Sequence, residues 1–363
     1  MNNNTKKHTG VFCNAPFRCL MINAKGDCYF CGFGFGKGVD NCLGNILEVE
    51  DAFRDIWNGK KAQSIRKSVL NGTYGFCYKD CGNLNGINGR VTRIEDADKE
   101  VYDEITQGIN ERERKIIETK DVCLDYGPKD VILSALRCNL KCPSCREEYN
   151  TRKELATEIE VEELHRKRLP LMKESRQLIF GYTGEFTLNE LNKKVMYTAT
   201  EKELPKLESI VIQSNGVLFT PDLYDAFSPY MKSKLHRIEF SVDAGTEETY
   251  KENRPGGNWE AIMKNLEYIA KNKGDFQLQI NYVVQANNYK EIPIIVEKAN
   301  ELGCNVNFQQ IKNWGTFSEE KFAEKNIFSE KHNENSNFLE IMRKYKSEKF
   351  VLMEFDVDFT QLL

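Results

Sequence analysis

Three cysteines lie close together near the middle of the chain. Cys138, Cys142 and Cys145 are separated by three and two residues, and they follow the apolar run 131–133. Three thiolates on one loop can hold three irons of a 4Fe-4S cluster, and the fourth iron then lacks a protein ligand, because such clusters normally take four cysteines. An open iron can do chemistry. A zinc site is the alternative, and three close cysteines do not decide between the two.

The spacing Cys-x3-Cys-x2-Cys after a strand resembles the signature of the radical S-adenosylmethionine (radical SAM) enzymes. The resemblance implies that the open iron chelates the amino and carboxylate groups of S-adenosylmethionine (SAM). It also implies one-electron reduction of the sulfonium, release of methionine, and a 5'-deoxyadenosyl radical that takes a hydrogen atom from a substrate. On this interpretation the chain is an enzyme.

The composition describes an ordinary globular protein. The chain has 363 residues, 40% apolar and 29% charged, a net charge of -4 and a pI near 5.8. This charge argues against a dedicated nucleic-acid binder, and an RNA-modifying enzyme would need a basic face. The first twelve residues are polar, and no run approaches the ~18 apolar residues of a membrane span. We therefore expect a cytoplasmic protein without a membrane partner.

The twelve cysteines are distributed unevenly, because ten of them lie between residues 13 and 81 or between residues 138 and 145. The cytosol keeps thiols reduced, so this clustering favours two metal centres over disulfides. We expect the outlying Cys123 and Cys304 to be buried thiols.

The N-terminal group combines a hairpin with a helix. The alternation around Gly26 predicts a hairpin that brings Cys13 and Cys31 to one region. Apolar residues at helical spacing over 51–70 predict helical structure that ends at Asn71 and Gly72.

This stretch resembles the SPASM and shorter twitch modules of radical SAM enzymes, on the spacing of Cys13, Gly26 and Cys31 and on the text of residues 43–57. The resemblance implies a second, auxiliary 4Fe-4S cluster. Its ligands would be Cys13, Cys31, Cys77 and Cys81. A structural zinc knot of the same thiolates is the alternative. Cys19, Cys28 and Cys42 are expected as buried free thiols, or as spare ligands.

Residues 91–120 are densely charged, with apolar residues at helical spacing, which predicts a solvated helix joining two modules. Six strands alternating with amphipathic helices follow, which predicts βα repeats and a parallel sheet. The predicted strands are 131–133, 177–180, 209–212, 237–241, 277–284 and 305–308. The fold class is therefore α/β, and the resemblance implies a partial (β/α)6 barrel of the radical SAM type. A terminal strand is expected within 350–355.

We divide the chain into four parts, each defined by its residues. They are an auxiliary iron-sulfur module (1–90), a helical linker (91–128), a core barrel (129–317) and a C-terminal extension (318–363).

Ligands of such folds lie at the carboxyl ends of the strands, so the residues after each strand are the candidates for binding. By resemblance, the motifs there bind SAM through Gly184, Glu185, Ser214, Asn215, Ser241, Asp243 and Arg254. An arginine suits a carboxylate because its fork donates two charge-assisted hydrogen bonds. Thr183 and Ser144 depart from the family pattern, since a glycine and an aromatic residue are usual there.

Polar residues after the last two strands are placed near the substrate, although such residues often only cap a strand. They are Gln285, Gln310, Asn313 and Trp314. We expect a peptide or small-molecule substrate, in a maturase or an oxidoreductase, and a one-electron donor such as flavodoxin or ferredoxin. The alternative function is a non-catalytic zinc or iron-sulfur scaffold, in which the three-cysteine loop holds a saturated metal.

Overall fold

The computed structural model describes residues 10–31, 40–78, 81, 84, 91–94, 109–145 and 158–354. Contacts divide the chain into two compact units, which we call the first and the second unit. The first unit consists of Met1–Ser134, Glu154–Tyr182 and Ala199–Ser209. The second unit consists of Ala135–Lys153, Thr183–Thr198 and Ile210–Leu363.

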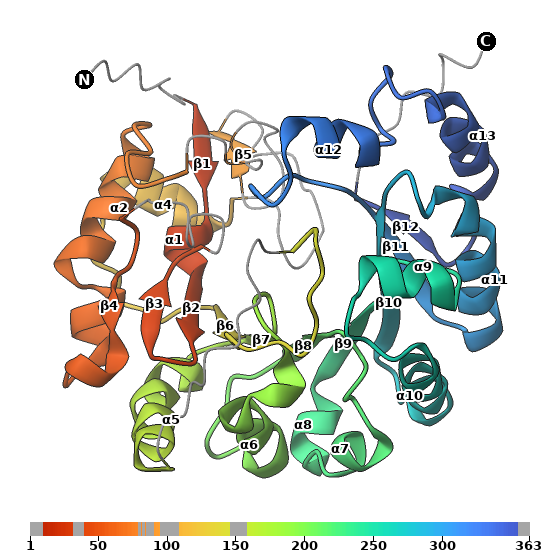
Figure 1. Cartoon of the computed structure of the whole chain (residues 1–363). Coiled ribbons are helices and arrows are strands. Elements are labelled where there is room, and N and C mark those ends of the chain that lie inside the picture. The colour runs from red at the N-terminus through yellow and green to blue at the C-terminus, as the bar shows by residue number, and fades with distance from the viewer. Residues whose placement is uncertain are drawn as a thin grey trace. The chain divides into compact units, whose positions relative to one another are not determined.

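The first unit carries a mixed group of strands (Figure 1). Its helices and strands are β1 (Val11–Cys13), α1 (Ala15–Arg18), β2 (Cys19–Asn23), β3 (Asp27–Tyr29), β4 (Gly44–Asn45), the 3-10 helix η2 (Ile46–Glu48), the π-helix η3 (Phe53–Trp57), α2 (Lys60–Leu70), β5 (Val91–Arg93), α4 (Glu111–Thr119), β6 (Asp130–Ser134), α5 (Glu158–Lys173) and β7 (Gln177–Phe180). Strands β7, β6 and β2 pair in parallel, and β3 and β4 extend them antiparallel. Strand β1 pairs with β5 alone.

The predicted hairpin around Gly26 is confirmed. The side-chain oxygen of Asn23 accepts hydrogen bonds from the backbone N–H groups of Lys25 (2.8 Å) and Asp27 (3.0 Å). Gly26 has a φ of +89°, a conformation that favours glycine. Helix α2 ends at Asn71, and Gly72 follows at positive φ, as the sequence predicted.

The predicted helix over residues 91–120 is wrong at its start. Val91–Arg93 form strand β5, which pairs antiparallel with β1. Among the described residues of this range, the helical part is α4, which begins with a capping box formed by Asn110 and Glu113. Residues 95–108 of the predicted helix lie outside the described residues. Glu113 is buried in a salt bridge with Arg18, so this helix is packed rather than solvated on all sides.

The second unit contains five parallel strands in the order β8-β9-β10-β11-β12. Its elements are η5 (Phe186–Leu188), α6 (Glu190–Thr198), β8 (Ser209–Ser214, whose first residue belongs to the first unit), α7 (Pro221–Asp225), α8 (Pro229–Ser233), β9 (Leu235–Ser241), α9 (Glu247–Asn253), α10 (Trp259–Asn272), β10 (Gln277–Val284), η6 (Tyr289–Glu291), α11 (Ile292–Leu302), β11 (Asn305–Gln310), α12 (Glu319–Lys325), α13 (Asn335–Tyr345) and β12 (Val351–Met353). The strands alternate with helices along the chain (Figure 1).

Side chains alternate between two different faces of these five strands. One face is apolar and fully buried, as Ile238, Ile280 and Val306 show. The other face is polar and consists mainly of Gln213, Arg237, Glu239, Gln279, Asn281, Asn307 and Gln309. Parallel strands are usually apolar on both faces, because helices cover both. A polar face is therefore a departure that calls for a functional reason.

The six predicted βα strands all form, and four of them are longer than predicted by two residues each. The expected terminal strand within 350–355 forms as β12. The predicted α/β class with mostly parallel strands is confirmed. Within the described ranges, every helix is too short or too polar to serve as a membrane span.

Candidate functional site

The three-cysteine loop follows β6 in the chain and is held from two directions within the second unit. The backbone N–H of Lys141 donates to the carbonyl of Pro255 at 2.8 Å, and that of Glu185 donates to Arg137 at 2.6 Å. Gly184, at φ +76°, lies so close that an added Cβ would stand 2.2 Å from the carbonyl oxygen of Ala135. A side chain at residue 184 would therefore push the loop away.

The family pattern has a glycine where this chain has Thr183, and the structure accommodates the exchange. Gly184, not Thr183, takes the positive φ. The Thr183 hydroxyl donates to the carbonyl of Ala135 at 3.2 Å. The threonine thus adds a contact to the cysteine loop instead of restricting its backbone.

Glu185 follows strand β7 in the sequence, and its side chain is fully buried. Its Oε1 accepts hydrogen bonds from the Ser214 hydroxyl (2.7 Å) and from both the N–H and the hydroxyl of Thr187. Its Oε2 accepts from the N–H of Asn215 at 2.7 Å. Burial raises the pKa of Glu185, and these hydrogen bonds oppose the rise. Since a carboxylate offers about four acceptor positions, only Oε2 has room for a further donor.

Two cysteine sulfurs already receive hydrogen bonds from N–H donors. The side-chain amide of Asn215 donates to Cys138 Sγ at 3.7 Å, and the backbone N–H of Leu140 does so at 3.4 Å. Arg254 Nη1 donates to Cys142 Sγ at 3.6 Å. Burial raises the pKa of Cys142, and the Arg254 guanidinium counteracts it. These donors suit thiolates rather than neutral thiols.

Asp243 and Arg254 form an ion pair beside this loop. Arg254 Nη2 lies 2.5 Å from Asp243 Oδ2, and both side chains are largely buried. The other carboxylate oxygen of Asp243 accepts from the N–H of Val283 at 2.7 Å. Burial lowers the pKa of Arg254, but the charges of Asp243 and Cys142 outweigh it, so the pKa is raised and the arginine stays charged.

Two buried polar atoms at this site lack a hydrogen-bond partner among the described residues. They are Nε of Arg254 and the hydroxyl of Tyr250. Sequence reasoning assigned Arg254 but missed Tyr250, because nothing distinguishes a tyrosine in a short helix from a packing residue. Buried polar groups are normally paired, so two orphans beside three cysteines indicate a missing ligand.

The residues of the loop fit an iron-sulfur cluster with one open iron. They supply three thiols, N–H donors to two of them, and a charged arginine. Within the described residues, no three Cys, His, Asp or Glu side chains are arranged to hold a single metal ion.

The four N-terminal cysteines assigned to a second cluster belong to the first unit, where Cys13 interacts electrostatically with the other three. Burial and then the thiol of Cys31 raise the pKa of Cys13, and Cys77 and Cys81 add to the rise. Burial, Cys31 and Cys81 raise the pKa of Cys77 to about 12. The raised pKa values of Cys13 and Cys77 fit thiols that would bind a metal, because bound metal supplies the charge that stabilises thiolates.

Family models match both cysteine regions. Residues 132–299 match the radical SAM superfamily, and residues 13–82 match the SPASM iron-sulfur cluster-binding domain. The chain is a member of the radical SAM superfamily with an N-terminal SPASM domain. The predicted fold class, a radical SAM barrel with a small N-terminal module, is confirmed.

Solved structures similar to this radical SAM protein share little sequence with it. SuiB of Streptococcus suis, bound to its precursor peptide SuiA, is 14% identical with a TM-score of 0.49, over 97% of this chain and 73% of that one. TYW1 with a lysine-pyruvate adduct is 15% identical with a TM-score of 0.41, over 59% and 70%. The anSMEcpe enzyme with bound AdoMet and a peptide is 17% identical with a TM-score of 0.42, over 62% and 63%. No curated protein sequence matches the chain.

The remaining cysteines follow the predictions only in part. Cys19, Cys28 and Cys304 are buried, as expected. Cys42 is half-buried, and Cys123 is exposed, so the prediction that Cys123 is buried is wrong. Residue 123 follows α4 by only a few positions, and the chain there runs along the surface instead of turning into the core.

The residues predicted to lie near the substrate have different environments. Gln285 is buried, whereas Gln310 and Trp314 are exposed. The side-chain oxygen of Asn313 accepts hydrogen bonds from the backbone N–H groups of Gly315, Thr316 and Phe317. Asn313 thus forms a turn, the capping role that the sequence left open. Ser241, assigned to SAM, is the half-buried last residue of β9.

A polar cavity of about 290 Å³ lies against the polar strand face of the radical SAM domain. It is lined by Gln213, Arg237, Glu239, Gln279, Asn307, Gln309, Leu352, Met353 and Glu354. Glu239 accepts from Arg237 Nε (2.6 Å), and also from Gln213 (2.9 Å) and Asn281 (2.8 Å). Within each strand polar and apolar residues alternate, as in Arg237 to Ser241, and this alternation in the sequence is the signal that indicates a polar face.

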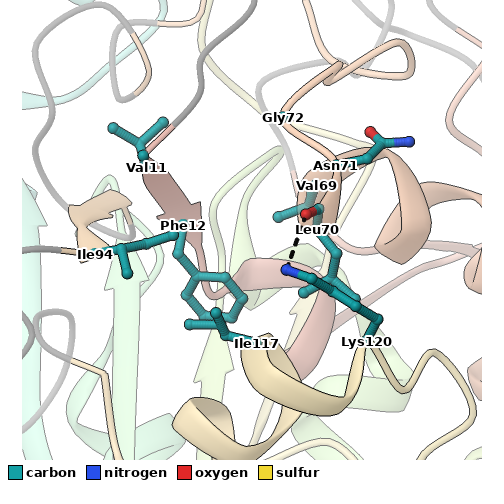
Figure 2. A pocket seen from close by; sticks show the side chains of 10 residues that line it. Val11, Phe12, Val69, Leu70, Asn71, Gly72, Ile94, Ile117 and Lys120 are labelled. Carbon is teal, nitrogen blue, oxygen red and sulfur yellow. Dashed lines mark hydrogen bonds between the residues drawn. The ribbon is translucent and has the colours of Figure 1, made fainter.

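A second cavity, of about 220 Å³, lies within the SPASM-containing first unit (Figure 2). Val11 and Phe12 of β1 line it, directly before Cys13. Lys120 Nζ donates to the carbonyl of Leu70 at its rim, at 3.4 Å. None of the predicted ligands lines this cavity.

Proposed function

We propose that this protein reductively cleaves SAM and uses the resulting 5'-deoxyadenosyl radical to abstract a hydrogen atom from its substrate. One observation carries the proposal. Three thiols share a loop on which a buried Asn215 and Arg254 already direct N–H donors to two sulfurs. The alternative scaffold function gives no reason for a charged arginine beside one of these thiols.

Each residue of the site has a defined role in this proposal. Cys138, Cys142 and Cys145 hold the 4Fe-4S cluster, which supplies the electron that splits SAM when both are bound. Gly184 leaves space for the loop, and Glu185 fixes the backbone of Asn215.

The SAM-binding residues act through polar groups at the carboxyl ends of the strands. The free acceptor position on Oε2 of Glu185 suits the SAM amino group, and the unpartnered Nε of Arg254 suits a carboxylate. Ser214, Ser241 and Asp243 complete the predicted set. Ser214 holds Glu185 through its hydroxyl, and Asp243 orients Arg254.

The four N-terminal cysteines hold the auxiliary 4Fe-4S cluster in this proposal. Cys13, Cys31, Cys77 and Cys81 saturate its four irons, so the cluster transfers electrons rather than binding the substrate directly. A flavodoxin or ferredoxin would supply the electron for the radical reaction.

The substrate, a peptide or a polar small molecule, would occupy the cavity on the polar strand face. Arg237 uses Nε for Glu239, and its two terminal nitrogens have no partner in the described part of the chain. These nitrogens suit a carboxylate or another acceptor of the substrate. None of the residues predicted near the substrate, Gln285, Gln310, Asn313 and Trp314, lines this cavity.

Anaerobic reconstitution with iron and sulfide, followed by dithionite and SAM, tests the proposal. We expect 5'-deoxyadenosine by mass spectrometry and about eight irons per chain, as two 4Fe-4S clusters require. Cys142→Ala is the control and should produce no 5'-deoxyadenosine. Zinc in place of iron, or no SAM cleavage by the fully loaded protein even with candidate substrates, would instead support the scaffold function.

A further inference from the structure

The unpartnered hydroxyl of Tyr250 is the least explained polar group near the cysteine loop. Tyr250 lies in α9, its side chain is 0% exposed, and its hydroxyl has no partner among the described residues. A buried hydroxyl that no protein group pairs with is a cost of folding. An unpaired buried group of this kind is retained where its hydrogen-bond partner is a ligand that binds after folding.

The position of Tyr250 limits what that partner can be. Its ring packs under Gly257, where an added Cβ would stand 2.6 Å from the hydroxyl oxygen. The segment containing Gly257 lies against the cysteine loop, because Pro255 accepts the N–H of Lys141 and Gly256 approaches the carbonyl of Asn139. Burial raises the pKa of Tyr250, Arg254 lowers it, and the nearby thiol of Cys142 adds to the rise.

We propose that Tyr250 donates its hydroxyl hydrogen to a sulfur of the cluster held by Cys142, and that Tyr250 and Arg254 together set the reduction potential of that cluster. The inference rests on the proposed function, since it requires the cluster. A cluster sulfur is favoured over SAM as the acceptor, because SAM binds from solvent whereas the Tyr250 hydroxyl has no exposed surface. Both residues act on the cluster through hydrogen bonds and charge, so they are positioning residues.

The sign of the effect follows from charge. One-electron reduction adds a negative charge to the cluster, and an O–H or N–H donor to sulfur stabilises the reduced form more than the oxidised form. Removal of the donor therefore lowers the potential. For Tyr250→Phe, which deletes only the hydroxyl, we expect the equilibrium constant for reduction to fall by about three- to tenfold, at most ~59 mV for one electron.

An EPR-monitored redox titration of the reconstituted full-length protein without SAM measures this shift. The signal of the loop cluster is identified as the one that changes when SAM is added, and the auxiliary signal is the internal reference. Tyr268→Phe is the matched control, because its exposed hydroxyl bonds to Asp225. Arg254→Gln should lower the potential further than Tyr250→Phe, and Arg254→Lys should restore part of the loss by keeping the charge.

The melting temperature of the cluster-free protein provides a second readout. There the loss of the Tyr250 hydroxyl should be neutral or stabilising. Tyr250→Phe removes a hydroxyl that has no partner there, so the melting temperature should stay the same or rise. Tyr282→Phe is the comparison, because the Tyr282 hydroxyl is also fully buried but donates to the Asn288 carbonyl at 2.8 Å. That variant should melt at a lower temperature.

The outcomes separate the inference from the proposed function. An unchanged potential in Tyr250→Phe overturns the inference and leaves the proposed function intact. If the same variant instead binds SAM more weakly, its hydroxyl serves SAM. A parent protein without any SAM-responsive signal would overturn the proposed function, and the inference with it.

Discussion

The two cysteine regions of this protein differ in the groups that surround their thiols. On the three-cysteine loop, Cys142 faces the charged Arg254, and Cys145 is exposed. In the N-terminal group, by contrast, the neighbours that shift the pKa of Cys13 are mainly other thiols. In the proposed function, the loop would hold a cluster with one iron open to an exchangeable ligand. The N-terminal group would hold a cluster saturated by four thiolates, which the charge of its irons stabilises.

Single substitutions in each region give the largest contrast. Cys142→Ala should abolish 5'-deoxyadenosine formation and leave about four irons per chain, those of the auxiliary cluster. Cys77→Ala should also lose about four irons but still cleave SAM, because Cys77 belongs to the other group. Iron analysis and mass spectrometry after anaerobic reconstitution measure both. Equal loss of SAM cleavage in the two variants would show that the regions are not independent.

Thiol reactivity in the cluster-free protein tests the same difference between the two cysteine regions. The thiolate is the reactive form, and the pKa of Cys77 is raised to about 12. At pH 8 its alkylation by iodoacetamide should be about a thousandfold slower than that of free N-acetylcysteine, and should rise tenfold per pH unit up to pH 11. The exposed Cys123 and Cys145 should be labelled first. Peptide mapping by mass spectrometry reads out each site.

The same pKa shift has a consequence for stability. The native pKa of Cys77 lies above its ordinary value of 9.0, so the cluster-free native state holds this proton more tightly than the unfolded state. The stabilisation is complete below pH 9 and is lost as the pH rises toward 12. Fast alkylation of Cys77 at pH 8 would contradict the burial of the N-terminal thiols.

The sequence predicted the parts of the site that depend on chain order. Periodicity predicted where the strands end, and the resemblance of the motifs after them to those of the radical SAM family assigned Glu185, Asn215, Asp243 and Arg254. Their hydrogen bonds to each other and to the cysteine loop depend on tertiary contacts that periodicity does not encode. The proposed role of Tyr250 also depends on tertiary structure, since it is inferred from a buried hydroxyl that lacks a hydrogen-bond partner among the described residues.

The errors have physical causes as well. A dense charge run suggested one helix over residues 91–120, yet pairing with β1 converts Val91–Arg93 into a strand. Such a tertiary contact outweighs local helix preference. The polar strand face was readable from the alternation at Gln279 and Asn281, but the strands were taken only as evidence of a parallel sheet.

The next largest effect is expected on the free energy of unfolding, because there is no room for a side chain at Gly184 beside the three-cysteine loop. Gly184→Ala places a Cβ against the carbonyl of Ala135 at positive φ, so we expect a loss of about 3 kcal/mol or more in the free energy of unfolding. Gly274→Ala is the control, because nothing lies within 4 Å of its Cβ. Urea denaturation of the cluster-free proteins measures both. A loss below about 1 kcal/mol in Gly184→Ala would mean that the loop can move away without cost.

The smallest effects test whether the N-terminal group has further ligands. Cys28 is fully buried and its thiol points to the carbonyl of Gly26 at 3.5 Å, whereas Cys123 is exposed. Cys28→Ser should lower the free energy of unfolding by about 1–2 kcal/mol, because a buried hydroxyl is costlier to desolvate than a thiol. Cys123→Ser should change it by less than about 0.5 kcal/mol.

Iron content decides what the stability values mean. Both serine variants should retain about eight irons per chain, because neither cysteine belongs to the two predicted ligand sets. If Cys28→Ser instead loses about four irons, Cys28 is a ligand of the auxiliary cluster, and the set of Cys13, Cys31, Cys77 and Cys81 has to be revised. The two cysteine regions would then differ in ligand number as well as in the charges around them.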